Sequence, residues 1–323
     1  MSNSAPYPPL SEKVHRLITQ QKSDWPLFRD NLAGMARIES KNYPFGEFQI
    51  TAQFNPERIR SSAAKTDDVS IRERPCFLCE KNRPKEQQGI DLDGKYTILV
   101  NPYPIFPKHL TIPLKEHLPQ RIAPYFRDML QLSRELPGFT IFYNGPQSGA
   151  SAPDHFHFQA GTKKVMPAER EMEKITALYG GVLYQDKGIT VQWAGKEYLR
   201  KFICLRSASI TELVRSFAII LNLLEERRQE GEPMMNILTG FENGNWTVTI
   251  FPRDRQRPRQ FFEKGAKQIV MSPASVEFGG LAVLPRKEDF DKLSREDLAD
   301  IYDQVTINDA DFEQLKQTIK STL

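Results

Sequence analysis

The segment HFHFQA, residues 155–160, decides how the first half of this chain folds. In an extended strand the side chains alternate between two faces, so His155, His157 and Gln159 share one face while the two phenylalanines share the other. Two aromatic side chains can anchor the strand in a core, and the imidazoles and the amide can then line a cleft. The alternative interpretation is a half-polar edge strand without chemistry.

The same order of elements recurs later in the chain without the histidines. The first half has strands predicted at 109–113, 139–145 and 155–160 and a helix at 119–136; the second half has KFICLRS (201–207), a helix at 211–228, MNILTGF (235–241) and TVTIFPR (247–253). Corresponding elements are about 92 to 96 residues apart, which is the size of a duplicated small domain. We therefore predict an α+β fold of two tandem duplicated halves, residues 1–165 and 166–323, with antiparallel sheets and packed helices. An accidental likeness between two α+β halves is the alternative.

Further elements are predicted upstream of this repeat. Residues 11–36 carry helical spacing in two pieces, with Pro26 suited to the first turn of the second piece. Strands are expected at 46–54 and 96–101, and the polar stretch SSAAKTDDVSIRER, residues 61–74, is expected to be a mobile loop.

Composition excludes several classes of protein. The 323 residues are 39% hydrophobic and 26% charged, and no apolar run approaches the 18 residues of a membrane span. The net charge of only +3, from 44 basic and 41 acidic residues, argues against nucleic acid or an anionic membrane as partner. The amino terminus lacks a secretory signal pattern and the three cysteines make no disulfide framework, so we expect a cytoplasmic protein.

Two other segments carry functional signals. The loop NGPQSGAS, residues 144–151, can offer backbone N–H groups and hydroxyls to a phosphate. Cys76 and Cys79 have metal-ligand spacing, but the same pair can be a redox motif or two buried thiols. A tetrahedral zinc would need two imidazoles in addition, and the candidates are His109, His117 and His155. A set of Cys76, Cys79, His117 and His155 would leave His157 free.

PCFLC (75–79) and GASAPDHFHFQ (149–159) resemble the zinc motif and the active-site segment of the histidine-triad superfamily, in its galactose-1-phosphate uridylyltransferase branch. The resemblance implies zinc held by Cys76, Cys79, His117 and His155. It also implies a nucleophilic His157 and a Gln159 that contacts the phosphoryl group. This chain departs by one additional residue, Asp154. The hydrolases of the superfamily have a third histidine where this chain has glutamine, so transfer is implied rather than hydrolysis.

A second resemblance concerns the substrate. TAQFNPER (51–58), KEHLPQRI (115–122) and SPASVEFGGLAVLPRKEDF (272–290) resemble segments of the GDP-hexose phosphorylases, which cleave a nucleotide sugar with phosphate. The chain combines features of both branches, so neither alone identifies its substrate.

We therefore expect a nucleotidyltransferase or phosphorylase that acts on a nucleoside diphosphate sugar or dinucleotide through a nucleotidyl-histidine. The acceptor would be phosphate or a sugar 1-phosphate. For the attack, the other nitrogen of His157 must be held as a donor, by a backbone carbonyl for example. A histidine-triad hydrolase and a catalytically inactive zinc-stabilised nucleotide-binding module are the alternatives, and a homodimer is left open.

The remaining candidate residues are substrate contacts: Asn55, Arg58, Lys108, Asn144, Ser148, Gly149 and Ser151. Lys108 is equally interpreted as a solvated turn residue. The basic run Arg253 to Arg259 can serve a phosphate or be a solvated loop. Glu277 and Arg286 lie in the segment shared with the phosphorylases, without an assigned role.

Overall fold

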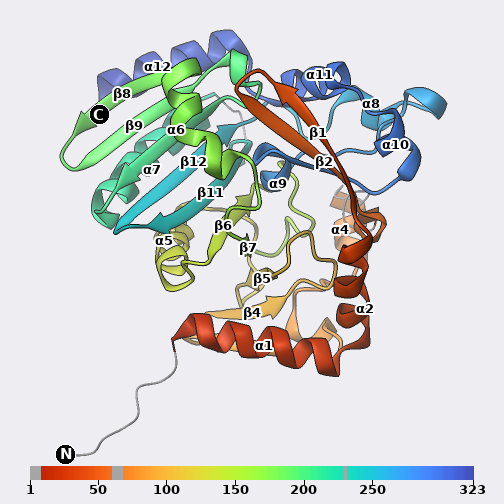
Figure 1. Cartoon of the computed structure of the whole chain (residues 1–323). Helices are drawn as coiled ribbons and strands as arrows, with labels where there is room; N and C mark the ends of the chain where they lie inside the picture. Colours follow the sequence, from red (N-terminus) through yellow and green to blue (C-terminus); the bar gives the residue numbers. More distant parts are fainter. Residues whose placement is uncertain (1–8, 60–67, 228–230) are drawn as a thin grey trace, which may run out of the picture.

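A computed structural model describes residues 9–59, 68–227 and 231–323. Its central feature is one ten-stranded sheet in the order β3-β4-β5-β7-β6-β11-β12-β10-β9-β8, and every neighbouring pair is antiparallel (Figure 1). The strands are β3 (Gly89–Leu92), β4 (Tyr96–Val100), β5 (His109–Pro113), β6 (Phe139–Asn144), β7 (His157–Thr162), β8 (Gly180–Asp186), β9 (Ile189–Ala194), β10 (Phe202–Ser207), β11 (Met235–Glu242) and β12 (Asn245–Pro252).

The two halves of this sheet have the same topology. Strands β3 to β7 run β3-β4-β5-β7-β6 from the outer edge to the middle, and β8 to β12 run β8-β9-β10-β12-β11. Helices α5 (Phe126–Glu135) and α7 (Ile210–Glu225) follow corresponding strands. The predicted α+β duplication is therefore confirmed. The boundary between residues 165 and 166 stays a prediction.

A first hydrophobic core lies on one face of the sheet. It contains Tyr143, Phe156 and Phe158 together with side chains from α5 and α7. Helices α1 (Leu10–Asp24), α2 (Pro26–Gly34) and α12 (Asp309–Thr322) also contribute to it. Because α5 and α7 pack on each other as well as on the strands, this core is continuous across both halves.

A second core lies over the other face, above the second half of the sheet. Cys204, Leu238 and Phe251 of the large sheet are buried there. They are covered by α6 (Ala168–Tyr179), α9 (Ser275–Phe278), α10 (Lys287–Lys292), α11 (Arg295–Val305) and a small sheet of β1 (Glu39–Phe45), β2 (Phe48–Phe54) and β13 (Leu281–Leu284). Strand β13 pairs in parallel with β2, so the C-terminal region is joined to the N-terminal hairpin. The same face of the first half is left partly open.

The remaining elements are short. They are α4 (Asp68–Glu73), α8 (Arg259–Phe262) and the 3-10 helices Met35–Arg37, Pro56–Arg58, Glu80–Asn82, Ala123–Tyr125, Lys196–Tyr198 and Gly265–Lys267. None of the helices within the described residues is long and apolar enough to cross a membrane.

Several predicted elements need correction. The expected mobile loop at 61–74 contains the helix α4, and its first residues, 61–67, lie outside the described residues. Strand β7 begins at His157, two residues after the predicted start, because His155 still belongs to the preceding loop. Helix α5 begins at Phe126 rather than 119, since the segment before it contains two prolines. Helix α7 ends at Glu225, and residue 228 of its predicted span lies outside the described residues.

Candidate active site

A cleft of about 550 Å³ lies against the open face of the first half of the sheet. Pleating of β7 brings His157 and Gln159 into its lining, while the phenylalanines beside them enter the first core. The strand register sets Gln159 between Thr111 of β5 and Phe142 of β6, both of which also line the cleft. The structure thus brings together the two residues predicted to be catalytic.

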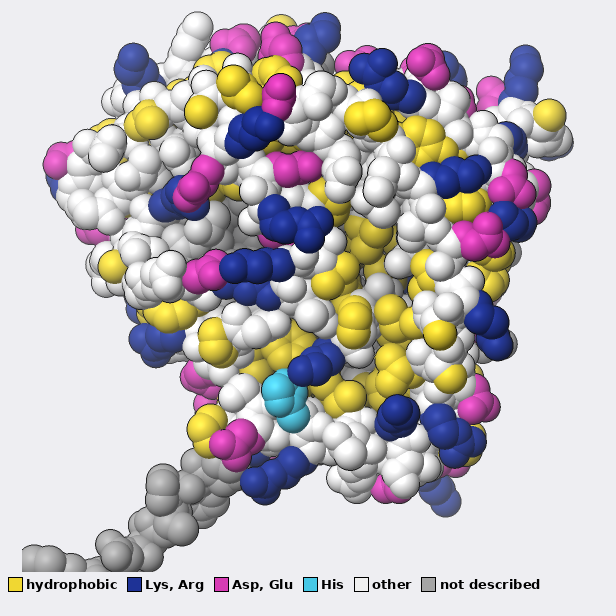
Figure 2. Space-filling view, viewed as in Figure 1, with side chains coloured by type: hydrophobic (Ala, Val, Ile, Leu, Met, Phe, Trp, Pro, Cys, Tyr) yellow, Lys and Arg dark blue, Asp and Glu magenta, His cyan; other side chains and the backbone are white. Residues whose placement is uncertain are grey.

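The two walls of the cleft differ in character. One wall is rich in apolar and aromatic side chains, among them Trp25, Phe77, Leu99 and Tyr103. Figure 2 shows hydrophobic side chains gathered between β5 and α2, on the side from which this wall comes. The facing wall comes from the second half and includes polar side chains, among them Gln256, Arg257, Ser272 and Glu277. Both halves of the chain therefore build the cleft.

His157 is held as a neutral imidazole. Its ring is only 3% exposed, and Nδ1 lies 2.9 Å from the backbone oxygen of His155. A carbonyl can only accept, so Nδ1 carries the hydrogen and Nε2 keeps its lone pair. Burial lowers the pKa of His157 to about 4, although the bond to His155 acts in the opposite direction. Gln120 fixes the strand at this point, because its side chain accepts from the N–H of His157 and donates to the carbonyl.

Gln159 is bound to His109, a residue that the sequence offered only as a possible metal ligand. His109 Nε2 lies 3.1 Å from Gln159 Oε1, and His109 Nδ1 accepts from the N–H of Ile105 at 3.2 Å. Burial, followed by the charge of Arg58, lowers the pKa of His109 to about 3. Two-residue alternation in HLTIP could have revealed that His109 and Thr111 share the face of the cleft.

The loop at 144–151 reaches the cleft with part of its predicted set. Asn144, Gly149 and Ser151 line the cleft, whereas Ser148 is fully buried beneath it. Gly149 has φ +97°, and a Cβ there would lie 2.5 Å from the Cβ of Ala274, so glycine is required for this approach. The loop is thereby packed against the segment that leads into α9.

Asn236 of β11 fastens this loop across the junction of the two halves. Its amide donates to Asn144 Oδ1 at 2.9 Å and to the carbonyl of Ser148 at 2.7 Å. Its own Oδ1 accepts from Arg253, and Asn144 Oδ1 also accepts from the N–H of Ser275. The first residue of the loop is therefore held from two elements of the second half.

A cluster that could hold a metal ion adjoins the cleft. The ligand atoms of Cys76, Cys79, His117 and His155 all lie within 4.8 Å of one another. Nδ1 of His155 lies 3.3 Å from the sulfur of Cys76, and Nδ1 of His117 lies 3.1 Å from the sulfur of Cys79. The other nitrogen of His155 is 2.8 Å from the carbonyl of Leu114, which leaves Nδ1 as the free ligand atom. His109 lies outside this cluster.

Asp154, the residue by which the chain departs from the family motif, links the cluster to the cleft. One of its carboxylate oxygens is 3.6 Å from Nε2 of His117, and the other accepts from Arg74 at 2.7 Å. Arg74 itself lines the cleft and lies over the ring of Phe77.

The three other predicted contacts lie in different places. Arg58 lines the cleft and donates to the carbonyl of Tyr103 at 2.9 Å. Asn55 is buried and donates to the carbonyl of Pro104, and it is not part of the lining. Lys108 is likewise absent from the lining, and its ammonium lies 3.0 Å from the exposed His15.

Two arginines of the basic run at 253–259 have different surroundings. Arg253 is buried and donates to the carbonyls of Val305 and Pro273, among others, so it has a structural role. Arg257 lines the cleft, where burial lowers its pKa. Glu277 also lines the cleft, and burial raises the pKa of its carboxyl to about 7.

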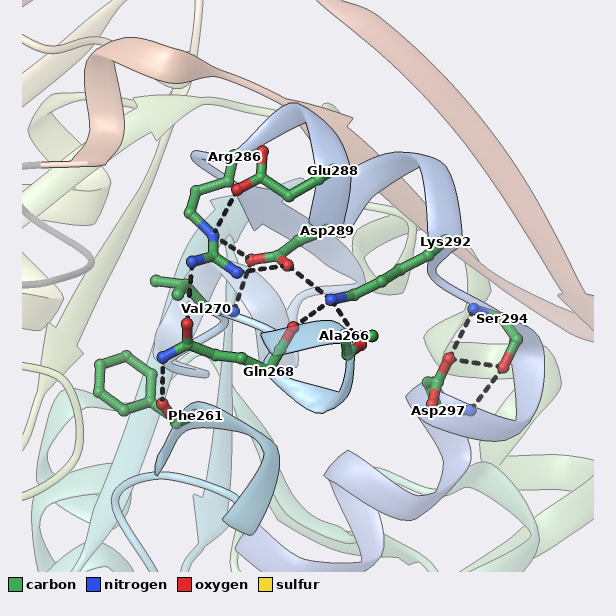
Figure 3. Close-up of polar contacts among 10 residues, drawn as sticks. All are labelled: Phe261, Ala266, Gln268, Val270, Arg286, Glu288, Asp289, Lys292, Ser294 and Asp297. Carbon is green, nitrogen blue, oxygen red and sulfur yellow. Dashed lines mark hydrogen bonds and ion pairs between the residues drawn. The ribbon is translucent and has the colours of Figure 1, made fainter. Parts of the chain in front are cut away.

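Arg286 lies in an ion cluster away from the cleft lining (Figure 3). Its guanidinium donates to both oxygens of Asp289 at 2.7 Å and to Gln268 at 2.9 Å. Asp289 also accepts from the N–H of Val270 and pairs with Lys292. Arg286 therefore fastens α10 to the segment before α9.

Two family models match the chain. The first, described as a domain of unknown function (DUF4922), matches residues 17–162. The second, described as GDPGP1-like, C-terminal domain, matches residues 183–323. No curated protein matches the chain.

Among solved structures, those of yeast Ap4A phosphorylase Apa2 are similar in fold. The complex with Ap4A has a TM-score of 0.58 and 16% sequence identity, over 92% of this chain and 98% of the other. The complex with AMP has a TM-score of 0.53 and 17% identity, over 90% of this chain and 97% of the other. At these identities the similarity establishes the fold alone, and it extends over both halves.

Proposed function

We propose that this chain transfers a nucleotide through a covalent nucleotidyl-histidine. Its residues 183–323 match the GDPGP1-like C-terminal domain. Together with the resemblance of PCFLC and GASAPDHFHFQ, this match supports the branch of galactose-1-phosphate uridylyltransferase-like and GDP-hexose phosphorylase-like enzymes in the histidine-triad superfamily. The donor is a nucleoside diphosphate sugar or a dinucleotide, and the acceptor is phosphate or a sugar 1-phosphate. The observation that carries this proposal is His157, a neutral ring in the cleft whose Nδ1 is held by the carbonyl of His155.

The reaction has two displacement steps. Nε2 of His157 attacks the α-phosphorus of the donor, a P–N bond forms, and the bond from phosphorus to the leaving phosphate oxygen breaks. An oxygen of the acceptor then attacks the same phosphorus and His157 leaves as the neutral ring. The amide of Gln159 donates to the non-bridging oxygens in both transition states, where their charge is greatest. Amide hydrogens do not protonate the nucleophile.

The walls of the cleft support a nucleotide with a polar partner. Trp25 and Tyr103 offer aromatic surface to a base, while Arg58 and the loop at Gly149 and Ser151 offer donors to phosphates. Arg257, on the facing wall, offers a second cationic group to the leaving or accepting phosphate. The AMP and Ap4A complexes of the yeast phosphorylase support a nucleotide in a fold of this kind.

We propose zinc as the metal of the cysteine–histidine cluster. With Zn–S near 2.3 Å and Zn–N near 2.1 Å, sulfur and nitrogen in a tetrahedron lie about 3.6 Å apart. Three sulfur–nitrogen distances in the cluster, 3.1, 3.3 and 3.5 Å, lie close to this value. When bound, zinc would crosslink the loop of Cys76 and Cys79 to the residue two positions before the nucleophile. Its role would be structural.

A thermal-shift screen with GDP-glucose, UDP-glucose, ADP-glucose and Ap4A, with and without phosphate, tests the substrate class. At least one donor should raise the melting temperature and be consumed faster when phosphate is present. A flat response to all four donors contradicts the proposal and favours an inactive module. Equal consumption with and without an acceptor indicates the hydrolase.

A further inference from the structure

His109 is a buried imidazole for which the proposed reaction has no direct use. It is 2% exposed, and each of its ring nitrogens lies within hydrogen-bond distance of a partner. The N–H of Ile105 can only donate, so Nδ1 of His109 is the acceptor in this bond. In a neutral ring the hydrogen then resides on Nε2, which donates to Oε1 of Gln159 at 3.1 Å.

The ring of His109 is also fixed by packing. Phe106 meets it edge-on with ring centroids 5.3 Å apart, and Phe142 lies 5.9 Å away. Gly161, the residue opposite His109 on β7, makes room for Phe106, because a Cβ there would lie 2.5 Å from the ring. His109 therefore has neither the space nor the partners to turn over.

The bond from His109 distinguishes the two ends of the Gln159 amide. It is the one hydrogen bond of this side chain found within the described parts of the chain, and it occupies the oxygen. The NH2 group is left for the cleft, where it presents donors. In the flipped amide the oxygen would face the cleft and repel the phosphoryl oxygens that the proposed reaction brings there.

We infer that His109 is a positioning residue, which sets the amide of Gln159 so that the NH2 group faces the reacting phosphoryl group. This inference rests on the proposed function for the identity of the group that receives the donors. The inference means that the part of the cleft next to the NH2 group of Gln159 binds an anionic oxygen of the substrate and disfavours a hydrogen-bond donor.

The test is kinetic, with the nucleotide donor and phosphate identified by the thermal-shift screen. His109→Phe should lower kcat by about 10- to 100-fold with little change in KM, since a donor is misdirected in the transition state. His109→Gln keeps a donor near Nε2 and should recover a large part of the loss. His15→Phe removes an exposed histidine as a control and should leave kcat unchanged.

A double-mutant cycle with Gln159→Ala separates positioning from general stability. If His109 acts through Gln159, the double variant is no slower than Gln159→Ala alone. The inference would be overturned if the losses of kcat caused by the two single substitutions multiplied in the double variant. An unchanged kcat in His109→Phe would overturn it as well. Melting temperatures of all variants show whether each still folds.

A measurement without substrate separates this inference from the proposed function. Long-range ¹H–¹⁵N correlations at pH 7 should show His109 protonated at Nε2 and unprotonated at Nδ1. The other tautomer, or a charged ring, overturns the inference even if the enzyme is active. If the expected tautomer is found but none of the four donors reacts, the proposed function fails and the orientation of Gln159 stands.

Discussion

Five consecutive residues, 155–159, serve three different parts of the molecule. His155 belongs to the metal cluster, His157 and Gln159 line the cleft, and the two phenylalanines are in the first core. Because successive side chains of a strand point to opposite faces, a shift by one residue would turn the imidazole of His157 into the first core and the aromatic rings toward the cleft. Register is thus a condition of the chemistry as well as of the fold.

Replacing His157 should remove the covalent intermediate. His157→Ala, incubated with the α-phosphate-labelled donor in the absence of acceptor, should retain no label, because no nitrogen remains to form the P–N bond. His157→Gly should recover activity when imidazole is added, because the ring that it replaces lines the cleft. Full turnover by His157→Ala contradicts the mechanism, and His15→Ala is the matched control.

Acid should destabilise the protein through His109. Its pKa of about 3 in the fold is below the ordinary value of 6.5, so the unfolded chain binds more protons between these values. The free energy of unfolding therefore falls as pH decreases through this window, by up to about 1.4 kcal/mol per pH unit for this one group. Urea titrations of wild type and His109→Gln from pH 7 to 4 should show a shallower dependence in the variant. An equal dependence would contradict this account.

For single residues, the sequence could predict a role where the motif that carries it is local. The pleat of β7 places His157 and Gln159 on one face, and the spacing of the cysteines indicates a metal pair, a redox motif or two buried thiols. Their roles and the full set of metal ligands followed from the resemblance of these local motifs to a known family. The roles of His109 and Arg257 depend on which strands and loops meet in space, and no short pattern reports that. Lys108 shows the converse. It was a candidate phosphate contact, with a solvated turn residue as the alternative, and its ammonium lies beside His15 outside the cleft lining.

The metal cluster acts at the scale of elements, because its ligands come from separate loops. Protein purified without chelator should contain about one zinc per chain. Cys76→Ser should lose most of the metal and lower the melting temperature by about 3 °C or more, since a loss of roughly 2 kcal/mol has this effect in a chain of this size. Cys204→Ser, at a buried thiol outside the cluster, is the control for metal content. Metal-free wild type of equal stability would contradict the zinc proposal.

Helices and strands could be predicted where the hydrophobic periodicity was strong. Their boundaries could be predicted where a proline or a turn marked them. Strand β5 has its predicted bounds, and α2 begins at Pro26 as expected. Strand β1 was not predicted, because its residues are mostly exposed and polar and it contains Pro44. Helix α4 was taken for a loop, since a six-residue polar helix has no apolar stripe to reveal it.

At the scale of the molecule, Asn236 joins the two halves at the site. Asn236→Ala would leave the buried carbonyl of Ser148 without its donor, while Arg253 would lose one of several acceptors and Asn144 one of two donors. We expect the free energy of unfolding to fall by about 2 kcal/mol, because one unpaired buried group costs about 1–3 kcal/mol. Chemical denaturation measures this loss, with the exposed Asn245→Ala as control. A change within 0.5 kcal/mol, roughly that of a surface substitution, would contradict the assignment.

The order of strands and helices in the sequence predicted the duplication, but it did not predict how the two halves pack together. Sequence spacing does not say that β6 and β11 pair, or that β1, β2 and β13 cover the face of the second half. These contacts join segments more than 90 residues apart. The face that would hold a second cleft is filled by the second core.

The pairing of β6 with β11 has a consequence for how such a chain is organised. The two strands occupy equivalent positions in the halves and pair antiparallel, as equivalent edges of identical subunits do about a twofold axis. The chain is thus built like a dimer whose subunits have been joined covalently. The linker keeps both copies at a high effective concentration whatever the amount of protein in the cell. One copy can then hold the reactive strand while the other supplies a wall of its cleft.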